Sequence, residues 1–197
     1  MRYILFIIAS MTFFLSACNG NTGDKNMPVT DPLPAVAKGP SFFPVTSYIK
    51  GQIYDINQRH INPLKYIIVN GHTDSTWLKP EEFDAAFAEF LTPVIDSTNL
   101  INIFTENNFT DLSYDSAFTF VYEPKVPLSD TFTLRSWVVY VEPIKSNVKR
   151  IYMVKYKNNK EMKLTWQSDR WCSIITVVTG TNGKSVIEKE EKIIWDF

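Results

Sequence analysis

Few side chains in this sequence have the types and spacing of a catalytic or metal-binding site. His72 and Asp74 are two residues apart, so the carboxylate could orient the imidazole, or both groups could bind a metal ion. A metal site usually needs a third ligand, and the other histidine, His60, is distant in sequence. No H-E-x-x-H motif is present. We interpret His72 and Asp74 as residues of a solvated loop, and His60 as a residue beside the C-terminal carbonyls of a helix.

Cys172 is the remaining candidate nucleophile. A reactive cysteine needs a lowered pKa, usually from a neighbouring histidine or a helix N-terminus. Neither histidine is close to Cys172 in sequence, and a lone cysteine on a predicted strand is typical of an apolar core. The chain has no G-x-S-x-G, P-loop or G-x-G-x-x-G motif. The sequence therefore predicts no catalytic residue, no metal and no cofactor.

Aromatic side chains on the predicted strands of the second half are a more promising feature. Such rings can form a platform for sugars, apolar ligands or peptides, or they can pack in the core of the sheet. Two tryptophans flank one tight turn, Ser168-Asp169-Arg170, which we expect at the surface. The candidate ligand-binding residues are Trp166, Asp169, Arg170 and Trp171, with Tyr140, Tyr152 and Tyr156 on neighbouring predicted strands.

The elements that would position these residues follow from the spacing of apolar side chains. Helical spacing predicts helices over 44–59 and 80–92, and is compatible with a short helix over 97–104. Alternation and turn residues predict strands over 64–69, 117–122, 132–141, 151–157, 161–167, 171–179 and 185–195. The last of these is polar in its middle, which favours an edge position or exposure to solvent.

Helices followed by consecutive strands indicate an α+β fold. We expect N-terminal helices packed on a curved, mainly antiparallel sheet of about five to six strands. This layout resembles cystatin-like and nuclear-transport-factor-2-like folds. The resemblance is one of topology without any shared motif, so it implies no function.

The first eighteen residues have the anatomy of a secretory signal peptide. Arg2 precedes an apolar run over 4–15 that is too short to span a bilayer, and small residues follow it. The tetrapeptide Leu15-Ser16-Ala17-Cys18 resembles the lipobox of bacterial lipoproteins. That resemblance implies cleavage before Cys18 and lipid on its thiol, which would anchor the chain in a membrane. An ordinary cleavable leader that ends in cysteine is the alternative.

The predicted organisation is a signal peptide over 1–17, a lipidated Cys18 with a Pro-rich linker over 18–40, and one globular domain over 41–197. Asn19, rather than aspartate, follows Cys18, and in lipoproteins this favours the outer membrane. No acidic cluster follows it directly, so we expect the domain to face the periplasm. With Cys18 lipidated, Cys172 has no partner for an internal disulfide.

The charges exclude one class of partner. The chain is nearly neutral, with a formal net charge of −1 and no basic block, which argues against nucleic acid. The sequence therefore indicates an envelope lipoprotein whose non-catalytic domain binds a protein or a small ligand. A structural or assembly subunit of an outer-membrane complex and, less favoured, a hydrolase of envelope polymers are the alternatives. The sequence leaves the oligomeric state open.

Overall fold

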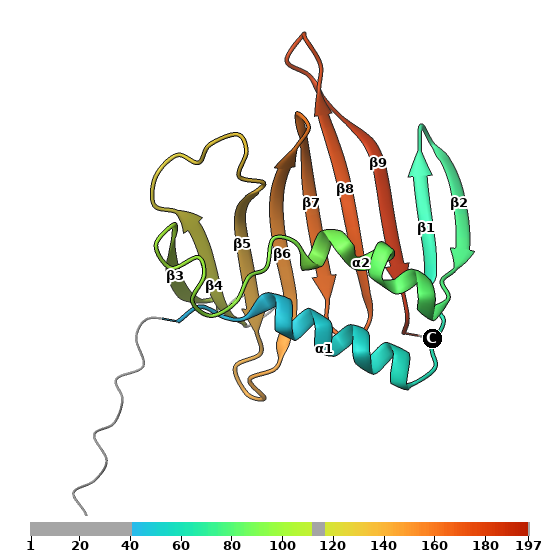
Figure 1. Ribbon diagram of the computed structural model, residues 1–197, viewed down its shortest axis with the longest axis horizontal. Coiled ribbons are helices and arrows are strands. Elements are labelled where there is room, and N and C mark those ends of the chain that lie inside the picture. Colours follow the sequence, from blue (N-terminus) through green and yellow to red (C-terminus); the bar gives the residue numbers. More distant parts are fainter. Residues whose placement is uncertain (1–40, 112–116, 197) are drawn as a thin grey trace, which may run out of the picture. The chain divides into compact units, whose positions relative to one another are not determined.

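An antiparallel sheet of nine strands carries the fold of the described residues, which are 41–111 and 117–196 of the computed structural model (Figure 1). All of them belong to one compact unit. The signal peptide, Cys18 and the linker that the sequence predicts lie outside the described residues. The strand order across the sheet is β2-β1-β9-β8-β7-β6-β5-β4-β3. The chain thus builds a meander from β3 to β9 and places the first hairpin beside β9.

The elements have the following bounds. Two helices and one short 3-10 turn are α1 (Val45–Gln58), η1 (Pro80–Glu82) and α2 (Phe83–Leu91). The strands are β1 (Leu64–Val69), β2 (His72–Trp77), β3 (Phe104–Asp111), β4 (Ala117–Pro124), β5 (Leu134–Val141), β6 (Val148–Lys157), β7 (Lys160–Gln167), β8 (Trp171–Thr179) and β9 (Ser185–Ile194).

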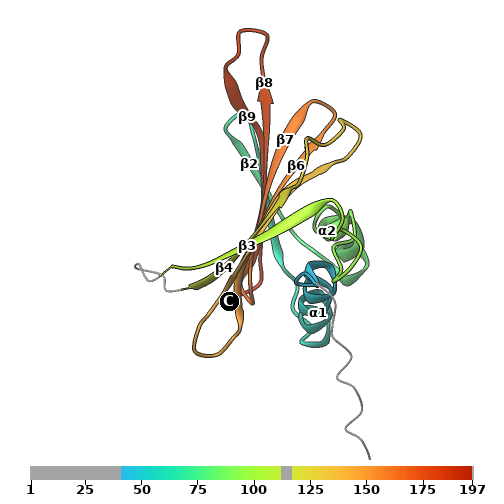
Figure 2. The same cartoon turned by 90° about the vertical axis from the view of Figure 1, so that its left-hand side faces the viewer.

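Both helices lie on the same face of the sheet, and the opposite face carries no helix (Figure 2). Each helix has one apolar stripe that faces the sheet. In α1 the stripe includes Val45, Ile49 and Ile56, and in α2 it consists of Phe83, Phe87 and Phe90. No helix among the described residues is both long enough and apolar enough to cross a bilayer.

Buried aromatic rings form the core between the helices and the sheet. The Trp166 ring centroid lies 5.3 Å from that of Phe90 and 5.6 Å from that of Phe87, both on α2. Further along the sheet, the Tyr122 and Trp137 rings stack with their centroids 4.5 Å apart and their planes 8° apart. Fully buried rings of this size contribute much of the apolar area that stabilises the domain.

The predicted fold class was wrong. The sheet has nine strands, not five or six, and the two α-helices have only 14 and nine residues. Two edge strands were missed, since His72–Trp77 was interpreted as a loop and no element was predicted over 105–111. Residues 97–103 form bends and turns and not a short helix. The last strand, β9, does not lie at an edge, because it pairs with β1 on one side and with β8 on the other.

Candidate functional site

The uncovered face of the sheet carries a continuous set of side chains in register across all nine strands. Cross-strand pairing aligns one row on this face: Trp77, Leu64, Ile194, Trp171, Gln167, Arg150, Tyr140, Thr119 and Phe109. A second row runs beside it: Ser75, Tyr66, Lys192, Ser173, Thr165, Tyr152, Val138, Val121 and Asn107. Directly opposite residues in a sheet point to the same face, so both rows form one surface, in which Thr119 is the one buried member.

Cations stack on three of the rings at this face. The Arg150 guanidinium lies 5.2 Å from the centre of the Tyr140 ring, and the Lys192 ammonium lies 5.0 Å from the Trp171 ring. The Arg135 guanidinium lies 5.5 Å from the Tyr156 ring, at a bulge of β5. Each such contact contributes roughly 0.5–1 kcal/mol at an exposed site. The stacking orders both the ring and the cation, so the face is apolar and positively charged at the same places.

The ends of the first row are its most exposed part. Trp77, on edge strand β2, is 57 % exposed, and Phe109, on edge strand β3, is 55 % exposed. The rings between them, including Tyr140, Tyr152 and Trp171, are half-buried by their neighbours in the sheet. We call this surface, defined by the two rows together with Arg135 and Tyr156, the aromatic face.

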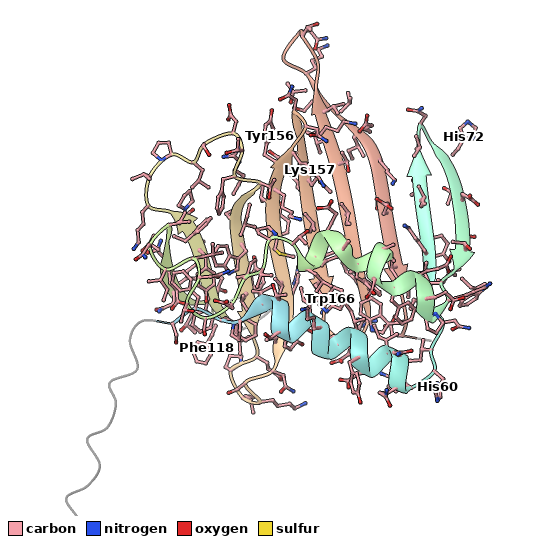
Figure 3. The ribbon with its side chains drawn as sticks, viewed as in Figure 1. His60, His72, Phe118, Tyr156, Lys157 and Trp166 are labelled. Atoms are coloured by element: carbon pink, nitrogen blue, oxygen red, sulfur yellow. The ribbon has the colours of Figure 1, made fainter. Side chains whose placement is uncertain are left out.

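The structure separates the four residues that the sequence predicts as one ligand-binding site. Trp166 lies between the sheet and the helices (Figure 3) and is fully buried. Trp171 belongs to the aromatic face, by its pairing with Gln167 and Ile194. Asp169 occupies the turn with a positive φ of 61°, and its N–H donates to the Gln52 side chain. The Arg170 guanidinium pairs with Asp196 at 2.6 Å. Only Trp171 therefore shares a surface with the predicted aromatic platform.

Tyr140, Tyr152 and Tyr156 do lie on the aromatic face with Trp171. The sequence prediction missed Tyr66 and Trp77 from the first hairpin, because their strands were not expected beside β8 and β9. It also missed the stacked cations, whose signal is their cross-strand position rather than any local motif.

The candidate catalytic side chains do not converge. His72 lies at the hairpin end of β2, and His60 follows α1 at a separate place (Figure 3). Cys172 lies on β8, three strands from β2, which places it at least about 14 Å from His72. Burial raises the pKa of the Cys172 thiol well above its usual value, so the thiol is not activated. Cys172 is 1 % exposed and packs in the core, as the sequence predicts.

The interpretation of His72 and Asp74 is correct in one respect and wrong in another. They belong to a strand and not to a loop, but both are exposed to solvent, as the interpretation says. The Asp74 carboxylate accepts a hydrogen bond from the N–H of Ser75 at 2.8 Å. His60 adopts a positive φ of 52° after α1, and its N–H donates to the Asn57 carbonyl. It is the backbone of His60, then, that contacts the helix end.

A second polar site lies on the helix-covered side, where α2 ends. A cavity of about 310 Å³ is lined by Glu89, Thr92, Pro93, Thr133, Lys155 and Lys157. The Glu89 carboxylate accepts from Lys155 at 2.7 Å and from Lys157 at 2.9 Å. Burial lowers the pKa of Lys155, and the bonds to Glu89 only partly offset that effect. Because these bonds tie α2 to β6, we interpret this cluster as a structural contact.

No group of three or more histidine, cysteine, aspartate or glutamate side chains that could hold a metal ion occurs within 41–111 and 117–196. Comparisons with protein-family models, with curated proteins and with solved structures found no match. The resemblances to bacterial lipoproteins and to cystatin-like and nuclear-transport-factor-2-like folds therefore stay predictions.

Proposed function

We propose that this chain is a membrane-anchored envelope lipoprotein whose domain binds a partner protein through the aromatic face. The observation that carries the proposal is the register of aromatic and cationic side chains on a sheet face without a helix. The anchor rests on the leader and on Leu15-Ser16-Ala17-Cys18. Its expected place is the outer membrane, with the domain in the periplasm.

The chemistry of the aromatic face favours a protein over a small molecule. Tyrosine, tryptophan and arginine are the residue types enriched at interface hot spots. Nine strands spaced about 4.8 Å apart give a surface roughly 40 Å wide, enough for an interface of about 800 Å² per partner. The cavity beside Glu89 is lined by other residues, and the cavity beside Phe118 shares only Phe109, at the β3 edge, with this surface.

The two alternative functions, an assembly subunit and a hydrolase, each lose the observation that motivated them. An assembly role was motivated by a free edge at the final strand, but β9 pairs with β1 over residues 189–194, so most of that edge is occupied. A hydrolase would need His72, Asp74 or Cys172 to converge with another polar group in a pocket, but β1 and β9 separate Cys172 on β8 from His72 and Asp74 on β2.

Site-specific photo-crosslinking in the cells that produce the protein tests the proposal. A photoreactive residue replaces Ser173 at the centre of the aromatic face or, as the matched control, Ser47 on the exposed side of α1. We expect a discrete adduct of defined mass from position 173 and none from position 47. The adduct should be lost when Thr165, the neighbour of Ser173 on β7, is changed to glutamate in the same chain. Equal adducts from both positions, or none from position 173, would contradict the proposal.

A further inference from the structure

The outer strand β3 combines an open edge with an adjoining apolar cavity. Its register with β4 continues from Phe104 to Asp111 without a bulge, and β3 pairs with no other strand of the described sheet. Every second residue of an edge strand turns its N–H and C=O away from its neighbour, where another strand can pair. The strand contains no proline and no lysine, two residues that commonly block such pairing.

The opposite edge, β2, differs in one contact. There the Asp74 carboxylate accepts from the N–H of Ser75, and this bond occupies a main-chain donor of the edge strand. An incoming strand at β2 would have to displace a charged side chain. The two edges are therefore not equivalent, and β3 is the more open to strand addition.

A cavity of about 380 Å³ lies at the β3 edge. It is lined by Asn108, Phe109, Thr110, Phe118 and Phe120. Phe109 and Phe118 are 55 % and 41 % exposed, so two large apolar rings are open to solvent at this edge. A strand added beside β3 would direct alternate side chains to this side, so one apolar side chain of it could enter the cavity.

The charge of this hairpin is one-sided. The described charged side chains of β3 and β4 are Glu106 and Glu123, and neither strand contains lysine or arginine. The rest of the chain has many basic residues, so the local charge is distinct from the near-neutral whole. A basic segment would be attracted to this edge, and an acidic one would be repelled.

We propose that the β3 edge is a second binding site, which shares only the outermost strand with the aromatic face, for an extended peptide segment that pairs with β3. The segment carries an apolar or aromatic side chain for the cavity and lysine or arginine residues on either side of it. Main-chain hydrogen bonds to β3 supply affinity, and the cavity and the acidic hairpin supply selectivity.

The test uses the purified protein and a fluorescein-labelled synthetic peptide, acetyl-KTFTVTK-amide. Fluorescence anisotropy measures its binding, and amide chemical shifts locate it. We expect saturable binding with shifts on β3 and β4, and roughly tenfold weaker binding when glutamates replace both lysines or serines replace phenylalanine and valine. Two further peptides test the main-chain pairing. One is N-methylated at every second amide, and the other at the amides in between. Only the set that faces β3 should abolish binding.

A matched pair of protein variants completes the test. Asn108→Lys adds a positive charge at the cavity, and Asn57→Lys adds the same charge on the exposed surface of α1. We expect Asn108→Lys to weaken binding about tenfold and Asn57→Lys to leave it within about twofold. Equal effects of the two variants, equal binding of the two methylated peptides, or shifts confined to β1, β8 and β9 would overturn the proposal. None of these outcomes bears on the crosslinking from position 173.

Discussion

The ammonium group of Lys155 donates hydrogen bonds to both the main-chain carbonyl and the carboxylate of Glu89, at 2.6 Å and 2.7 Å. Lys155 points to the helix-covered face, where its side chain is only 3 % exposed, whereas that of Glu89 is 27 % exposed. The carbonyl belongs to the last turn of α2, where a cation is favourable. This contact joins α2 to β6, and among the described residues Glu89 is the carboxylate that pairs with the buried Lys155.

The pair predicts unequal effects for its two members. Glu89→Ala leaves the Lys155 charge buried without its carboxylate, and we expect a loss of about 3 kcal/mol in the free energy of unfolding. Lys155→Met removes the buried charge and keeps much of the apolar stem, so we expect a loss of about 1 kcal/mol. Urea denaturation measures both. The double variant should be more stable than Glu89→Ala alone, and the opposite order would contradict the role assigned to Lys155.

Acid should destabilise the domain through two carboxylates. Burial alone would raise the pKa of Glu89, but its bonds to Lys155 and Lys157 outweigh burial and hold the pKa below its usual value. The pKa of Glu191 is lowered in the same way by Lys189 and Lys65. A carboxylate with a lowered folded-state pKa stabilises the fold above its unfolded pKa of about 4.3, and this stability is lost as the pH falls through the folded value.

The measurement is urea denaturation at pH 7, pH 5 and pH 3.5. We expect little change between the first two values and a marked loss at the third. Glu89→Gln should be less stable at pH 7 and should lose less between pH 5 and pH 3.5. An equal loss in the variant and the wild type would show that Glu89 does not contribute to this pH dependence.

The two tryptophans beside the 168–170 turn should respond differently to truncation. Trp166→Ala removes a ring that packs on Phe87, Phe90 and Trp195, and we expect a loss of about 3–5 kcal/mol in stability. Trp171→Ala removes a half-buried ring and its contact with Lys192, and we expect a loss of about 1 kcal/mol in stability. Thermal unfolding measures both. Similar losses would contradict the placement of the two rings on opposite faces.

These two residues also show how far the sequence could be interpreted. The strands over 161–167, 64–69 and 171–179 were predicted correctly, the first from its alternation of apolar and polar side chains and the other two from apolar runs beside turns. Trp166 and Trp171 were grouped as neighbours of one turn. In the hairpin Trp166 pairs with Cys172 and Trp171 with Gln167, and adjacent pairs point to opposite faces. Counting residues from the turn along both strands of the hairpin would have placed the two tryptophans on opposite faces of the sheet.

The edge strands could not be predicted from apolar alternation. All six residues of β2 are exposed, so burial leaves no pattern in His72–Trp77. In β3 only Phe104 is buried, and the rest of the strand is polar apart from the exposed Phe109. Their pairing is set by the hairpins and by neighbouring strands, and this long-range information is absent from a local window. For the same reason, neither the β3 edge nor the full width of the aromatic face could be predicted from the sequence.

Membrane anchoring is testable apart from the fold. Cys18→Ser removes the thiol that would carry the lipid, so we expect the protein to move from the membrane fraction to the soluble fraction of the cell envelope. Cys172→Ser, which removes the buried cysteine instead, serves as the control and should stay in the membrane fraction. Metabolic labelling with a radioactive fatty acid should mark the wild type and Cys172→Ser alone. Retention of the Cys18→Ser variant in membranes would contradict lipid anchoring.

Asp74 should protect the β2 edge from pairing with other chains. Asp74→Ala frees the N–H of Ser75 and removes a charge from a strand that is exposed along its whole length. We expect a larger fraction of associated protein, measured by size-exclusion chromatography with light scattering over a range of concentrations. Asp74→Asn keeps an oxygen that can accept the same bond, so it should associate less than Asp74→Ala. Asp55→Ala, on the exposed surface of α1, removes an equal charge and should behave as the wild type. If Asp55→Ala associates as strongly as Asp74→Ala, net charge rather than the Asp74–Ser75 contact controls association.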